Sequence, residues 1–182
     1  YTTGWLEMAI KQEVVSGSMS AEPFSNWAGP VSVALGASYR TEEVGDSASS
    51  PEDRAGVLTG GNYNPTFGKY NVTEYFGETV VPLLSEQPFA KQLDLNMGYR
   101  WTDYSTSGDV QTWKVGLSWS LTDEFRIRTT RSRDIRAPSL GDLFDAGTSG
   151  TGTIRDPFLN GRESQLVSQT RGNPAVKPEI GE

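Results

Sequence analysis

Apolar and polar side chains alternate along several stretches of this chain, most regularly between Leu93 and Trp101. Every odd position there is apolar, whereas the even positions include Asp94 and Arg100. A helix would spread these residues around its circumference, while a strand places alternate residues on opposite faces. The pattern therefore predicts an all-β, antiparallel meander of about six long strands, each with one apolar and one polar face. Related alternation occurs over residues 12–20, 31–40, 72–83, 111–121 and 125–130.

The connections between the predicted strands are of two kinds. Residues 45–70 and 134–182 contain many Gly, Pro and Asn residues and predict long loops, whereas residues 121–124 predict a tight turn. In an antiparallel meander, successive connections lie at alternate ends of the strands. The two long segments here fall at one end, and the tight turn falls at the other. Outer-membrane β-barrels have this layout, with long extracellular loops and short periplasmic turns. Residues 1–12 have no pattern that assigns them.

Strand length favours a transmembrane β-barrel over a soluble β-sandwich binding module, which alternation alone leaves open. Roughly 9–11 tilted residues cross the hydrocarbon layer, whereas strands of soluble folds have about 5–6. In a barrel the apolar face would contact lipid, and the polar face would line a wet lumen. The residues expected to face lipid are Val33, Leu35, Leu93, Leu95, Met97, Tyr99, Trp101, Trp113, Val115, Leu117 and Trp119. The polar residues expected in the lumen are Glu74, Glu78, Asp94, Asn96, Arg100, Lys114, Arg126 and Arg128.

The composition excludes several kinds of function within this chain. It contains no Cys and no His, which excludes disulfides, zinc sites built on these ligands, and catalysis by imidazole or thiolate. The formal charge of −7, without a basic stripe, makes nucleic acid an unexpected partner. We expect no catalytic residue, no metal site and no cofactor. An enzyme would need a carboxylate pair such as Asp142 with Asp145 or Asp103 with Asp109, and this is the less favoured alternative.

Several segments resemble the β-barrel of TonB-dependent outer-membrane receptors. Residues 28–40, 74–84, 98–105 and 113–119 are similar to consecutive strands of that barrel. The most specific segments are Arg136-Ala137-Pro138-Ser139-Leu140 with Leu143-Phe144, and Gly172-Asn173-Pro174 with Lys177-Pro178-Glu179. Arg131 and Ile135 depart from the family, which usually has an aromatic residue at the first position and Phe at the second.

The resemblance implies a barrel of about 22 strands closed around a plug, so the chain is expected to be a fragment from the C-terminal half that lacks the plug. It further implies import of a scarce nutrient, such as a ferric siderophore, vitamin B12 or an oligosaccharide, across the bacterial outer membrane. The implied partners are outer-membrane lipid, a small-molecule ligand, and the energy-transducing TonB complex of the inner membrane, acting through the plug.

Candidate ligand contacts lie in the two long loops. They are Tyr63, Tyr70, Phe144, Arg155, Asp156 and Arg162. The Pro138 and Pro174 rings fix φ, and Gly172 and Asn173 tolerate positive φ. We therefore interpret these four residues as determinants of loop shape.

Overall fold

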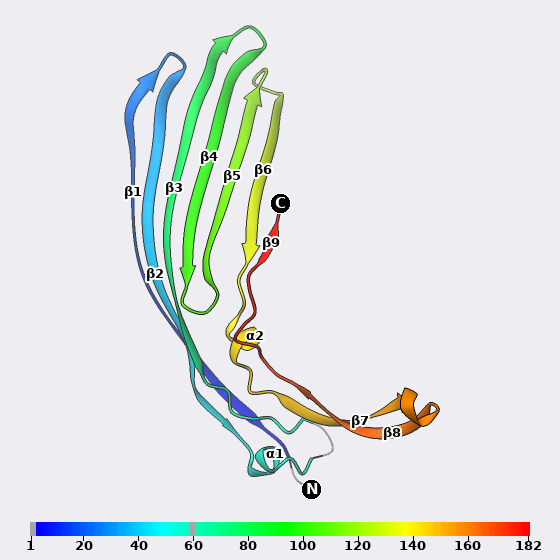
Figure 1. Ribbon diagram of the computed structural model, residues 1–182. Helices are drawn as coiled ribbons and strands as arrows, with labels where there is room; N and C mark the ends of the chain where they lie inside the picture. The colour runs from blue at the N-terminus through cyan, green and yellow to red at the C-terminus, as the bar shows by residue number, and fades with distance from the viewer. Residues whose placement is uncertain (1–2, 59–60) are drawn as a thin grey trace. The chain divides into compact units, whose positions relative to one another are not determined.

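The structure is a computed structural model that describes residues 3–58 and 61–182. Within these residues, one sheet has the strand order β1-β2-β3-β4-β5-β6-β9, and β7 pairs with β8 in a separate hairpin (Figure 1). Consecutive strands of the main sheet are neighbours up to β6, which confirms the all-β antiparallel meander; the sheet is not closed. The strands are β1 (Leu6–Asn26), β2 (Gly29–Ser49), β3 (Gly68–Gln87), β4 (Ala90–Tyr104), β5 (Gly108–Ser120), β6 (Arg126–Arg136), β7 (Thr148–Asp156), β8 (Arg162–Thr170) and β9 (Glu179–Gly181). The helices are α1 (Pro51–Ala55), α2 (Leu140–Phe144) and the 3₁₀ turn η1 (Pro157–Leu159).

The chain forms two compact units, which are described separately. The first comprises Tyr1–Glu13, Thr41–Tyr70 and Pro138–Val176, and the second comprises Val14–Arg40, Asn71–Ala137 and Lys177–Glu182. The long strands β1, β2 and β3 contribute residues to both units.

In the second unit, the register of β3 to β6 puts residues of one parity on one face. Leu95 of β4 lies opposite Leu117 of β5, while the next pair along, Asp94 with Ser118, points to the other face. The same parity continues into β6, where Arg128 lies opposite Ser118. We call the side that carries Leu95 and Leu117 the apolar face, and the side that carries Asp94 and Arg128 the polar face. The alternation predicted from the sequence is thus confirmed by strand pairing.

No second layer covers the apolar face in the described part of the chain. Val115 is 41% exposed and Leu117 is 38% exposed, and Leu95 is only half-buried. In a soluble sandwich these central side chains would be buried between two sheets. Such a broad exposed apolar surface is typical of a protein that contacts lipid or another protein.

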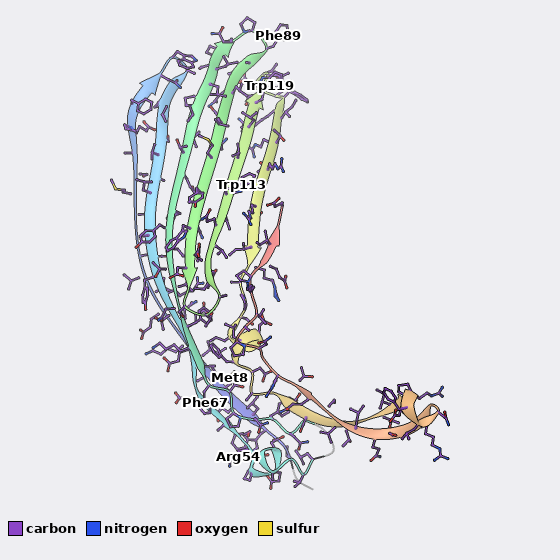
Figure 2. The ribbon with its side chains drawn as sticks, viewed as in Figure 1. Met8, Arg54, Phe67, Phe89, Trp113 and Trp119 are labelled. Carbon is purple, nitrogen blue, oxygen red and sulfur yellow. The ribbon has the colours of Figure 1, made fainter. Side chains whose placement is uncertain are left out.

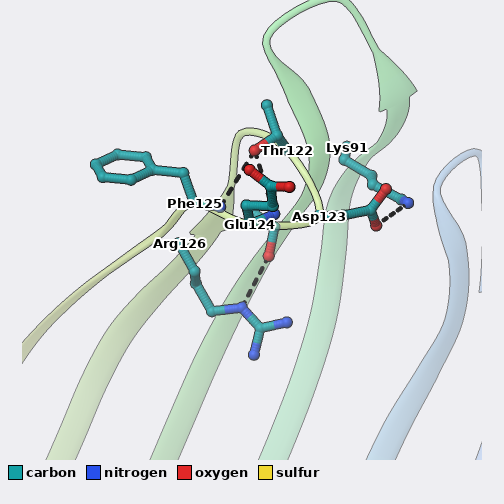
Figure 3. Close-up of polar contacts among 7 residues, drawn as sticks. Lys91, Thr122, Asp123, Glu124, Phe125 and Arg126 are labelled. Carbon is teal, nitrogen blue, oxygen red and sulfur yellow. Dashed lines mark hydrogen bonds and ion pairs between the residues drawn. The ribbon is translucent and has the colours of Figure 1, made fainter.

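The tight turn between β5 and β6 is held by its own side chains (Figure 3). The Thr122 hydroxyl accepts hydrogen bonds from the backbone N–H groups of Phe125, at 3.1 Å, and Glu124, at 3.3 Å. Asp123 forms an ion pair with Lys91, at the start of β4. Short polar side chains that hydrogen-bond to nearby backbone atoms favour turns, which explains why residues 121–124 form one, as predicted.

Aromatic side chains gather at the short-turn end of the second unit. The Trp119 indole donates a hydrogen bond to the carbonyl oxygen of Phe89, at 3.0 Å, in the turn between β3 and β4 (Figure 2). The Trp27 indole likewise donates to the carbonyl oxygen of Leu83, at 2.9 Å, where a register shift interrupts the pairing of β3 with β4. Each indole has an apolar body and one polar atom, which suits the boundary between hydrocarbon and water.

The first unit has a small core built around α1 and α2. Its buried apolar side chains are Val44, Tyr70, Leu140 and Leu143. The Asp53 carboxylate, 2% exposed, accepts hydrogen bonds from the Ser50 hydroxyl at 2.7 Å and from the backbone N–H groups of Trp5 at 2.9 Å and Tyr63 at 3.1 Å. Chiefly the Ser50 hydroxyl, and then these two N–H groups, hold the pKa of Asp53 below its ordinary value against the opposing effect of burial. One carboxylate therefore joins three separate segments of the loop region.

Several strands extend further than the sequence pattern indicates. β1 begins at Leu6, within the unassigned residues 1–12, of which residues 1 and 2 lie outside the described residues. β2 continues to Ser49 and β3 begins at Gly68, so the connection is shorter than the expected loop 45–70. The segment 134–182, expected as a loop, contains the β7–β8 hairpin. Alternation is weak there because Gly, Ser and Thr occupy many of the positions in β7 and β8.

Gly172 and Asn173 shape their loop for reasons other than the predicted one, since neither has positive φ. A Cβ atom on Gly172 would lie 2.7 Å from the backbone nitrogen of Asp145 and 2.9 Å from the carbonyl oxygen of Gly141. Gly172 is thus needed for close approach to α2. The Asn173 side chain instead accepts a hydrogen bond from the backbone N–H of Ala175, at 3.0 Å, which is an Asx turn.

Candidate functional site on the polar face

A hollow of ≈ 690 Å³ lies on the polar face of the second unit. Strands β2 to β6 all contribute to its lining, and the register brings the β3 and β4 residues into successive cross-strand rows: Glu74 with Thr102, Phe76 with Arg100, and Glu78 with Gly98. The hollow therefore combines both signs of charge with aromatic side chains, among them Phe76. Its charged lining residues are Arg40, Glu74, Glu78, Arg100, Lys114 and Asp134. Arg133 also borders it, although its position opposite Trp113 has the parity of the apolar face.

Glu74 organises one end of the hollow. Its carboxylate accepts hydrogen bonds from the hydroxyl groups of Ser38, at 3.1 Å, and Thr102, at 3.2 Å. The Nη1 atom of Arg100 lies 3.8 Å from Glu74 Oε1, and the Glu74 side chain is only 16% exposed. Hydroxyl groups from two neighbouring strands thus fix the carboxylate, and the carboxylate positions the guanidinium group.

The Phe76 ring forms the floor beside this pair. A Cβ atom on Gly36 would lie 2.3 Å from Phe76 Cζ, so the ring packs directly against the β2 backbone where there is no side chain. The Arg100 guanidinium lies over the ring, 5.3 Å from its centroid, within the range of a cation–π interaction. Glu74 and Phe76 flank the guanidinium of Arg100, whose side chain is 47% exposed, so its remaining N–H groups can reach an oxygen-rich ligand.

Glu78 and Lys114 occupy the other side of the hollow, separated by a glycine. Glu78 lies opposite Gly98, and Gly98 lies opposite Lys114 on the next strand. The Cγ atom of Glu78 is 3.7 Å from where a Gly98 Cβ would be. Among the residues that the structure describes, Lys114 forms no ion pair, so its ammonium group is available to a ligand.

The hollow collects five of the eight residues expected in the lumen. Glu74, Glu78, Asn96, Arg100 and Lys114 line it. Asp94, Arg126 and Arg128 share the polar face but are not part of the lining. Asp94 accepts a hydrogen bond from Gln92 at 2.8 Å, and Arg126 donates one to Ser120 at 2.9 Å. That this face lines a lumen stays a prediction.

Phe76 is not among the site residues predicted from the sequence, although the alternation pattern contains a signal for it. Phe76 is a large apolar residue on the polar parity of β3, which interrupts the alternation. A second signal is Gly36 on the polar parity of the neighbouring strand, because a glycine can leave room for a ring from the next strand. The contact between Phe76 and Gly36 depends on how β2 packs beside β3, and alternation within each strand does not predict that packing.

The candidate loop residues are distributed over the first unit. Tyr70 lies in β3 rather than in a loop, is 5% exposed, and donates its hydroxyl hydrogen bond to Glu42 at 2.7 Å. Phe144 packs its ring against the backbone of Gly68. Both side chains therefore have structural contacts in the interior of this unit.

The remaining loop candidates include three on the β7–β8 hairpin. Arg162 lies opposite Asp156 in the register, and Arg155 is adjacent to Asp156. The Asp156 carboxylate accepts a hydrogen bond from the backbone N–H of Phe158, at 2.8 Å, which caps η1. Tyr63 is 41% exposed. A role in ligand contact stays a prediction for Tyr63, Arg155, Asp156 and Arg162.

The antiparallel sheet with one apolar and one polar face has the architecture expected for a section of a β-barrel wall. The chain belongs to the TonB-dependent receptor-like β-barrel family, whose model matches residues 10–182. Comparison with curated proteins and with solved structures gave no match. In the described residues, no helix is long and apolar enough to cross a membrane. The family is one of outer-membrane receptors and transporters.

Proposed function

We propose that this chain forms part of an outer-membrane receptor that imports a scarce nutrient with energy supplied by the TonB complex of the inner membrane. Ferric siderophores, vitamin B12 and oligosaccharides are the candidate ligands. The proposal is supported by family membership and by the hollow on the polar face. The proposed role is binding and transport, and no bond-making step is assigned to any residue.

The observation that carries the proposal is that one hollow contains the Arg100 guanidinium, flanked by Glu74 and Phe76, and the Lys114 ammonium, which has no ion-pair partner among the described residues. Arg100 lies beside Glu74 and over the Phe76 ring, while Lys114 projects from the adjacent strand on the same face. Ligands of the proposed kinds carry many oxygen atoms, and each charge-assisted hydrogen bond to such an atom contributes about 1.5–3 kcal/mol. The hollow therefore offers the ligand a polar binding surface on its route through the barrel.

The test compares ligand uptake by cells whose receptor carries Arg100→Gln with Lys114→Gln, or the control Arg128→Gln. Arg128 lies on the same face outside the hollow. The double variant is expected to lower the affinity for the transported ligand at least about tenfold, while Arg128→Gln leaves it unchanged. A proton uncoupler should stop uptake but not binding. Uptake that is insensitive to the uncoupler, or a parent protein absent from the outer-membrane fraction, would contradict the proposal.

A further inference from the structure

The apolar face carries two arginines that the alternation pattern does not explain. Arg131 of β6 lies opposite Val115, and Arg133 lies opposite Trp113. Both have the parity of Leu117 and Trp119 rather than that of the polar face. An arginine that faces hydrocarbon is strongly unfavourable near the middle of the bilayer, and the penalty falls towards the interface.

The two arginines differ in their partners. The Nε atom of Arg133 lies 3.6 Å from Glu182 Oε1, next to β9. Arg131 is exposed and has no ion-pair partner among residues 3–58 and 61–182. Its neighbours on the apolar face of β5 and β6 are Val115, Thr129 and Arg133, and none of these is an acid.

The position of Arg131 allows its head group to reach the aromatic zone of this face. Trp113 lies opposite Tyr99 and is level with Arg133. Two residues beyond Tyr99 on β4, Trp101 stacks on Tyr75 with ring centroids 5.8 Å apart. Arg131 is two residues from the level of Trp113, which is about 7 Å along the strand. A long arginine side chain can extend over that distance and keep its stem in the apolar layer.

We propose that Arg131, with Arg133 and Trp113 beside it, binds the phosphate group of an anionic membrane lipid. The inference rests on the proposed membrane location of this face. A guanidinium group forms paired hydrogen bonds with phosphate oxygens, and basic groups near the membrane surface attract anionic headgroups. A lipid phosphate would neutralise the charge that no described carboxylate neutralises, while its acyl chains would cover Val115 and Leu117.

The test measures lipid binding to the delipidated full receptor in neutral detergent. Phosphatidylglycerol is titrated, and the bound lipid is counted by native mass spectrometry, with phosphatidylcholine as the lipid without net charge. Arg131→Gln is expected to weaken phosphatidylglycerol binding about fivefold, whereas phosphatidylcholine binding does not change. The matched control is Arg128→Gln, on the same strand and the opposite face, which should bind like the unmodified receptor.

A second variant separates lipid binding from an unseen contact within the protein. Arg131→Leu should lose the lipid preference and also resist urea better in lipid-free neutral detergent, since it removes an unpaired charge from an apolar surface. Equal phosphatidylglycerol binding by Arg131→Gln and the unmodified receptor would overturn the inference, and so would lower stability of Arg131→Leu. Nutrient uptake is measured in parallel: if lipid binding does not depend on Arg131 but uptake persists, this inference fails while the proposed transport function stands.

Discussion

Adding a single methyl group at Gly36 tests the aromatic floor of the hollow. In Gly36→Ala the new Cβ atom would lie 2.3 Å from Phe76 Cζ and within 2.9 Å of two further ring atoms. Carbon atoms in contact are normally about 3.5 Å apart, so the end of the ring must move by roughly 1.2 Å. That movement takes the ring from beneath the Arg100 guanidinium, now 5.3 Å from its centroid.

The expected cost follows from three contributions. Overpacking costs about 1–3 kcal/mol, and the weakened cation–π contact costs about 0.5–1 kcal/mol. Replacing glycine within a strand returns about 0.5–1 kcal/mol. The net loss in the free energy of unfolding is therefore about 2 kcal/mol. Gly17→Ala in β1 is the matched control, because nothing lies within 4 Å of its Cβ position, and it should be neutral or slightly stabilising.

The assay is urea unfolding of the receptor in detergent, followed by tryptophan fluorescence and extended to a double-mutant cycle with Phe76→Ala. Once the ring is removed, Gly36→Ala should cost little, which gives a coupling energy of at least about 1.5 kcal/mol. A penalty of the same size with and without the ring, or a Gly36→Ala effect no larger than that of Gly17→Ala, would refute the packing argument.

Three further predictions concern the apolar face and the loop region. Leu117→Arg should destabilise the receptor in bilayers by about 2–4 kcal/mol, whereas Ser118→Arg, one residue along on the polar face, should change the free energy of unfolding by less than about 1 kcal/mol. Gly172→Ala, whose Cβ would meet backbone atoms at 2.7 and 2.9 Å, should increase hydrogen exchange over residues 138–176, while Gly150→Ala in open space should not. Because the pKa of Asp53 is lowered, the stabilisation that its carboxylate provides is complete above about pH 4 and is lost as the pH falls through the lowered pKa. Hydrogen exchange around α1 should therefore rise in that acidic range. The Asp53→Asn variant should show the same raised exchange already at neutral pH.

The faces of the strands could be predicted from the sequence because alternation records directly which side each residue takes. The pairs Leu95 with Leu117 and Asp94 with Ser118 follow from two separately identified strands. The ends of the strands could not be predicted, since β2 continues to Ser49 through residues that alternate poorly. Backbone pairing with neighbouring strands, which a single strand's pattern does not contain, carries the sheet beyond its alternating centre.

The candidate site was predicted only in part for a related reason. Parity within a strand predicts that charged residues such as Arg100 and Lys114 lie on the polar face, but the hollow depends on contacts between strands. The Phe76 ring packs against Gly36 of the neighbouring strand. Alternation within a single strand shows a phenylalanine on the polar side only as an irregularity. The β7–β8 hairpin was missed because small residues give it almost no apolar face.

The central claim is that the apolar face contacts lipid while the polar face contacts water. Because this chain contributes no cysteine, single cysteines can be introduced at Leu117 and at Ser118, spin-labelled, and measured in bilayers for collision with oxygen, which concentrates in lipid, and with a water-soluble nickel chelate. We expect the label at position 117 to collide mainly with oxygen and the label at position 118 mainly with the nickel chelate. Equal accessibility of both labels to nickel, or protection of position 117 from both reagents by a covering protein layer, would contradict it.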